Sequence, residues 1–123
     1  MKTAIFVMSD PKAGEESLGR LFNALATASE SIQAGDEVDV VFAGAGTRWP
    51  GELTRLGHPA HGLYDAVRTS VKGASCGCAA AFGATSSVEA CGVPQIKDHK
   101  LAGTPGVASF RRYLQDGWRT LVF

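Results

Sequence analysis

Apolar residues gather in short runs along this chain, and the stretches between the runs have helical periodicity. The runs predict strands at Lys2–Met8, Glu37–Ala43, Val71–Ser75, Val93–Lys97 and Trp118–Phe123. They are apolar throughout rather than alternating between apolar and polar positions. That pattern is typical of parallel strands that are buried on both faces of a sheet.

The first two runs are separated by one amphipathic helix that ends near Gly35. Its apolar stripe recurs every three or four residues: Leu18, Leu21, Phe22, Leu25, Ala28 and Ile32. Turn residues fill Ser9–Gly14 before it. A glycine-rich loop that carries Trp49 is predicted at Gly44–Gly51 after the second strand.

Shorter helices are predicted along the rest of the chain. The pattern indicates a short helix at Glu52–Leu56 and a longer one marked by four apolar positions, Leu63, Tyr64, Val67 and Val71. Two more short helices follow at Cys78–Phe82 and Ser86–Cys91. For the last helix we expect Thr104 as N-cap, Pro105 at the first position and Gly117 as the stop.

Strands that alternate with helices predict one α/β domain over residues 1–123. The expected architecture is three-layer α/β/α with a mostly parallel five-stranded sheet. In such sheets, ligands bind at the carboxyl ends of the strands. Four segments that follow predicted strands are therefore candidates for a binding or catalytic site: Ser9–Gly14, Gly44–Gly51, Ser75–Cys78 and Asp98–Gly103.

The composition and charge of the chain argue against several classes of protein. The 123 residues include twelve basic and twelve acidic side chains, which argues against an electrostatic nucleic-acid or membrane binder. The opening apolar run, Ala4–Met8, is too short for a signal-peptide core or a membrane span. Three cysteines, an odd number, do not suit a secreted disulfide framework. We therefore expect a cytoplasmic protein.

Cys76 and Cys78 lie where the third strand ends and a helix begins. Helix N-terminal amides favour a thiolate there, and a thiolate can attack a sulfane sulfur or a disulfide. The competing interpretations are two small core residues, or a metal site completed by His58 and His61. A C-x-C spacing is not by itself a zinc signature, since a structural zinc site takes four ligands.

Two further residues are candidates for supporting roles. Cys91 is expected to be a packing residue, with a resolving thiol as the alternative. His99 follows the fourth strand, so it would share the carboxyl edge with the cysteines and could take the thiol's proton. No P-loop is present, and the glycine loop lacks the third glycine of G-x-G-x-x-G because Trp49 stands there. We predict no cofactor and no metal.

With these features together, the chain resembles the DsrE/DsrF-like family, which includes the sulfur-relay subunit TusD and the YchN-like proteins. The resemblance rests on the opening KTAIFVMSDP, the strand VDVVFAG, a cysteine at the end of the third strand followed by AAAFGA, and the closing strand WRTLVF. It implies a domain that assembles into homo- or hetero-oligomers, often trimers or hexamers. It also implies a cysteine after the third strand that carries sulfur as a persulfide.

Carried onto this sequence, that cysteine is Cys76 if the strand end sets the register and Cys78 if the helix start sets it. We expect Cys76 to hold the persulfide, with Cys78 assisting or resolving it. The leading hypothesis is thus a cytoplasmic, sulfurtransferase-like sulfur carrier with donor and acceptor proteins as partners. A non-catalytic oligomeric ligand-binding or interaction module and a C-x-C dithiol redox protein are the alternatives.

Overall fold

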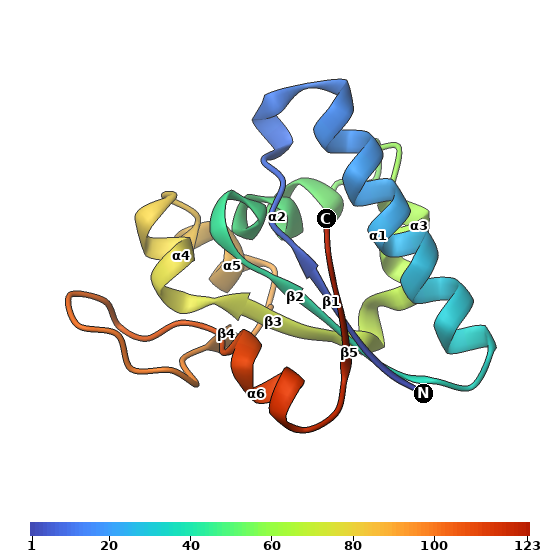
Figure 1. Cartoon of the computed structure of the whole chain (residues 1–123). Helices are drawn as coiled ribbons and strands as arrows, with labels where there is room; N and C mark the ends of the chain where they lie inside the picture. Colours follow the sequence, from blue (N-terminus) through green and yellow to red (C-terminus); the bar gives the residue numbers. More distant parts are fainter.

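Five parallel strands form one sheet in the order β4-β3-β2-β1-β5 (Figure 1). The computed structural model describes residues 1–123, the whole chain. The strands are β1 (Lys2–Val7), β2 (Glu37–Phe42), β3 (Val71–Ser75), β4 (Gln95–Ile96) and β5 (Arg119–Val122). Each lies within its predicted run, and every pairing is parallel. The predicted α/β fold is confirmed.

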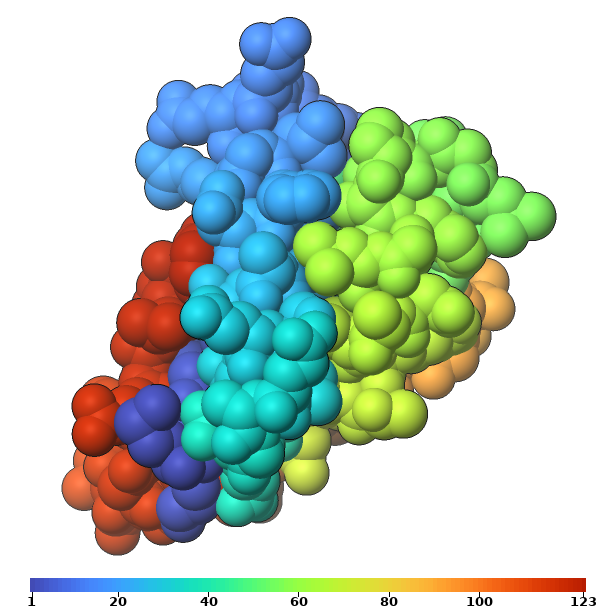
Figure 2. Space-filling model, turned by 90° about the vertical axis from the view of Figure 1, so that its right-hand side faces the viewer, coloured from blue at the N-terminus to red at the C-terminus, as the bar shows by residue number.

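Four helices cover one face of the sheet, which we call the first face. They are α1 (Glu15–Gln33), α2 (Trp49–Leu53), α3 (His61–Val67) and α5 (Thr85–Ala90). Successive strands from β1 to β4 step in one direction, and right-handed crossovers then place all their helices on one side. The core beneath them contains 19 buried residues. Figure 2 shows α1 and the chain around α3 side by side over this face.

The second face is covered by one short helix, α6 (Phe110–Gln115). The chain returns from β4, at one edge of the sheet, to β5 at the other, so this crossover passes over the opposite side. Phe110 stacks on Phe6 with ring centroids 3.7 Å apart, and Tyr113 meets Phe6 edge-on. Only six buried residues form this core. The edge strand β5 leaves Leu121 and Val122 exposed.

The segment predicted as an open glycine-rich loop is helical. Gly44–Arg48 forms a 3₁₀ helix, η2, and α2 begins directly at Trp49. Pro50, at the start of α2, fits the first turn because its missing N–H needs no partner there. The Trp49 side chain is buried in the first-face core, and its indole N–H donates to the Ser9 carbonyl at 2.8 Å. The Trp49 side chain therefore packs within its own domain.

The last helix begins later than predicted. Ser109, not Thr104, is the N-cap of α6, and its hydroxyl accepts from the Arg112 N–H at 3.1 Å. Residues 97–109 instead form a hairpin closed by an antiparallel bridge between His99 and Val107. Gly103 and Gly106 have φ angles of 80° and 109°, which a helix cannot accommodate. We call this segment the 97–109 hairpin.

The helices are too short or too polar for a membrane span. The third helix also departs from its prediction, since α3 ends at Val67 and Val71 already opens β3.

Candidate functional site

The cysteine pair lies on α4 (Cys76–Ala81), which follows β3 without an intervening loop at the carboxyl edge of the sheet. The connection after β3 passes over the first face and the connection after β4 over the second. Ligands bind preferentially at such topological switch points. Helix α4 straddles the edge, since Ala79 packs in the first-face core and Cys78 packs against the second-face core.

The two thiols of α4 differ in exposure. Cys76 is buried, with 7% of its surface exposed, whereas Cys78 is partly exposed. Residues two apart on an α-helix project about 200° apart, so the two sulfurs point to different sides. A Cys76–Cys78 disulfide would require the first turn of α4 to unwind. The geometry therefore disfavours the dithiol redox interpretation.

The 97–109 hairpin is hydrogen-bonded to the first turn of α4 and to the residue before it. The Gly77 N–H donates to the Gly106 carbonyl at 2.8 Å, and the Ala108 N–H donates to the Ser75 hydroxyl at 3.0 Å. A Cβ atom at position 77 would lie 2.9 Å from the Val107 Cγ1 atom. Only glycine permits this approach, so the hairpin and the Cys78 turn fit together as one unit.

His99 lies on this hairpin, at the carboxyl edge of β4. Its backbone pairs with Val107 through two hydrogen bonds of 2.9 Å, and its side chain is exposed. No hydrogen bond joins the His99 ring to either cysteine of α4. The structure thus brings His99 to the same edge, and its role as a proton acceptor stays a prediction.

Arg48 is a further residue of the candidate site, and no motif in the sequence indicates its role. Its Nε atom donates to the Phe82 carbonyl at 3.0 Å and its Nη1 atom to the Asp10 carboxylate at 3.0 Å. The guanidinium also lies 5.5 Å from the centre of the Phe82 ring. Arg48 therefore joins the chain after β1, the chain after β2 and the end of α4.

Asp10 caps a short 3₁₀ helix, η1 (Pro11–Ala13), by accepting from the Lys12 N–H at 2.9 Å. That hydrogen bond, followed by the Arg48 guanidinium, lowers the pKa of Asp10. Asp10 and Arg48 lie 38 positions apart, so no local motif could reveal the pair. They meet because β1 and β2 are parallel neighbours whose carboxyl ends share one edge.

The two histidines considered for a metal site are engaged elsewhere. The Nδ1 atom of His58 accepts from the Ala60 N–H at 3.1 Å, and burial lowers the pKa of this side chain. The Nδ1 atom of His61 lies 2.7 Å from the Leu53 carbonyl. No group of three or more His, Cys, Asp or Glu side chains is placed to hold a metal ion.

Cys91, one residue beyond α5, packs on the opposite face of the sheet from Cys78. It packs against the first-face core, and its thiol donates to the Val88 carbonyl at 3.4 Å. Cys78 packs against the other core. Within one chain, Cys91 is therefore not placed to resolve a persulfide on Cys78.

No family model matches the sequence, and no curated protein matches it. Among solved structures, the chain is similar to BT1422, a conserved protein of unknown function from Bacteroides thetaiotaomicron. The TM-score is 0.62 at 16% identity, over 99% of this chain and 95% of that chain. At this identity the likeness concerns the fold alone.

Proposed function

We propose that this protein is a sulfur carrier that accepts sulfane sulfur as a persulfide on Cys78. The supporting observation is a partly exposed thiol in the first turn of α4, at the point where the chain changes faces of the sheet. A donor protein must reach the sulfur that it loads. Because Cys76 is buried, we assign the acceptor role to Cys78 and a packing role to Cys76.

The transfer step needs no external oxidant or reductant. The Cys78 thiolate attacks the outer sulfur of a donor persulfide, R–S–SH, and a new S–S bond forms as the donor's S–S bond breaks. The donor leaves as the thiolate R–S⁻, and the product is Cys78–S–SH. Attack by an acceptor thiolate on that outer sulfur passes it on and restores the Cys78 thiolate.

The residues around Cys78 hold helix α4, and with it the Cys78 thiol, in place. Arg48 holds the end of α4, and the 97–109 hairpin holds its first turn. We propose the exposed His99 on this hairpin as the group that takes the thiol's proton. The same proposal includes donor and acceptor proteins as partners, a cytoplasmic location and assembly into a homo-oligomer. Light scattering on the purified chain would measure the oligomeric state.

Sulfur loading tests the proposal. The protein is incubated with a cysteine desulfurase and cysteine, or with thiosulfate, and intact mass spectrometry detects the gain of one sulfur atom. We expect loading in the parent chain, in Cys76→Ser and in Cys91→Ser, and its loss in Cys78→Ser. Far-UV circular dichroism and thermal melting confirm that each variant is folded. Undiminished loading of Cys78→Ser would overturn the assignment.

His99→Gln tests the proton acceptor separately. If His99 takes the thiol's proton, this variant loads more slowly near neutral pH and regains the parent rate at alkaline pH, where the thiol ionises without help. A slow rate at every pH would mean that His99 acts otherwise.

The alternative is a non-catalytic interaction module in which the cysteines pack. It is favoured by the contact of Cys78 with the second-face core. Under that interpretation no variant gains sulfur, and Cys78 reacts with iodoacetamide as slowly as Cys76 does.

A further inference from the structure

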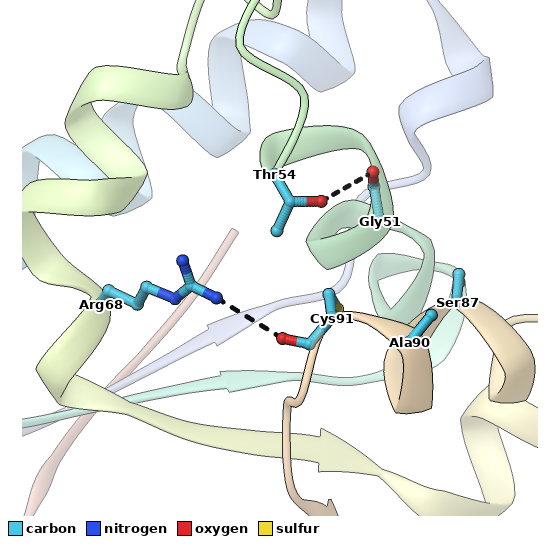
Figure 3. A pocket seen from close by; sticks show the side chains of 6 residues that line it. All are labelled: Gly51, Thr54, Arg68, Ser87, Ala90 and Cys91. Carbon is cyan, nitrogen blue, oxygen red and sulfur yellow. Dashed lines mark hydrogen bonds between the residues drawn. The ribbon is translucent and has the colours of Figure 1, made fainter.

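A cavity lies on the first face, apart from the Cys78 turn. Its volume is about 450 Å³, and residues of three separate segments line it (Figure 3): Gly51 and Thr54 at α2, Arg68 after α3, and Ser87, Ala90 and Cys91 at α5. A Cβ atom at Gly51 would lie 3.0 Å from the Ser87 Cβ atom, so α2 and α5 form a closely packed wall. The volume is in the range of small-molecule sites.

Arg68 is the single charged residue among those that line the cavity. It forms no ion pair with a carboxylate. Its Nη2 atom reaches the Cys91 carbonyl at 3.5 Å, a long hydrogen bond (Figure 3). Its guanidinium lies 5.9 Å from the centre of the Tyr64 ring. The guanidinium thus retains most of its five donors, in the planar arrangement that suits a carboxylate or a phosphate.

Tyr64 packs in the first-face core beneath the Arg68 guanidinium and does not itself line the cavity. The side chain is 1% exposed, and its hydroxyl group has no hydrogen-bond partner. Burial, followed by the neighbouring Cys91 thiol, raises the pKa of Tyr64. A buried, unpaired hydroxyl is costly and is uncommon in folded proteins.

Two of the residues that line the cavity, Thr54 and Ser87, carry hydroxyl groups. Thr54 donates to the Gly51 carbonyl at 3.2 Å and Ser87 to the Ala84 carbonyl at 3.0 Å. Both hydroxyl groups can rotate to donate to a ligand instead. The remaining lining side chains are uncharged, so nothing in the wall offsets the positive charge of Arg68.

We propose that this cavity binds a small oxyanion, a carboxylate or a tetrahedral anion of phosphate size, through the guanidinium of Arg68. Charge-assisted, bidentate hydrogen bonds from arginine are the strong and specific contacts for such groups. The proposal does not rest on sulfur transfer at Cys78, because that thiol packs on the opposite face.

Cys91 is a built-in reporter for the proposal. Iodoacetate and iodoacetamide attack the same thiolate and differ in charge, so the ratio of their rates is independent of the thiol's ionisation. Peptide mapping of the full chain gives this ratio for Cys91 and, in the same sample, for Cys78. We expect Arg68→Gln to lower the iodoacetate-to-iodoacetamide ratio at Cys91 about fivefold and Arg68→Lys to lower it less. The ratio at Cys78 should not change.

Binding itself is measured by titration with phosphate, acetate and thiosulfate in separate experiments, at ionic strength held constant with chloride. We expect at least one of them to slow alkylation of Cys91 saturably and to shift the backbone amide resonances of Gly51, Ser87 and Cys91. Both effects should be lost in Arg68→Gln with its melting temperature retained. An unchanged reagent ratio, or no saturable shift with any of the three anions, would overturn the proposal.

Discussion

The two faces of the sheet are built very differently. The first face has 19 buried residues beneath four helices, whereas the second has six beneath one helix of six residues and the 97–109 hairpin. The partly exposed thiol of α4, Cys78, packs against the thinly covered face. Regions with few buried contacts open most readily, and functional loops are drawn from them. The first face thus contains most of the buried apolar core, and Cys78 lies against the smaller one.

The largest expected effect comes from equal truncations on the two faces. Leu25 of α1 is fully buried, and Leu114 of α6 is 62% exposed. We expect Leu25→Ala to lower the free energy of unfolding by about 2–5 kcal/mol, because it removes core contacts and leaves a cavity. Leu114→Ala should change it by less than about 0.5 kcal/mol. Urea denaturation measures both, and equal losses would mean that α6 is as deeply packed as α1.

A smaller effect is expected where the hairpin meets α4. Gly77→Ala places a Cβ atom 2.9 Å from Val107, so the hairpin must shift, at a cost of about 1–3 kcal/mol. Hydrogen exchange of the Gly77 and Ala108 amides should accelerate. The matched control is Gly19→Ala in α1, which meets nothing within 4 Å and should stabilise the chain by about 0.5–1 kcal/mol. A neutral Gly77→Ala would show that the hairpin is not fastened to α4.

The smallest expected effect is on the pH dependence of the free energy of unfolding, through the two tyrosines, one on each face. Burial, and a 2.7 Å hydrogen bond that Tyr113 donates to Asp39, raise the pKa of Tyr113 far above its ordinary value of 10.0. The raised pKa stabilises the folded chain fully below pH 10, and this contribution is lost as the pH rises above the unfolded value.

Tyr113→Phe should therefore flatten the decline of the unfolding free energy above pH 10, by up to about 1.4 kcal/mol per pH unit. Tyr64→Phe should flatten it as well, since burial raises the pKa of Tyr64. Denaturant titrations between pH 8 and pH 11 measure the slopes. An unchanged slope in Tyr113→Phe would show that its phenol is not held neutral by the second face.

The sequence alone determined the strands, the parallel α/β fold and the position of the cysteine pair at a strand-to-helix junction. Local patterns suffice for these features, because a buried parallel strand requires an apolar run and an amphipathic helix requires a repeat of three and four. The run at Val71–Ser75 predicted β3 residue for residue.

Tertiary contacts decided what the local patterns left open. Whether Cys76 or Cys78 is exposed depends on the hairpin and on the two cores that meet at α4, which are distant in sequence. The link from Arg48 to Asp10 and Phe82 exists only because three strand ends share an edge. Thr104 carries good capping chemistry and still caps no helix, since the glycines beside it bend the chain into the hairpin. Exposure and long-range pairing are properties of the packed chain, and no window of the sequence contains them.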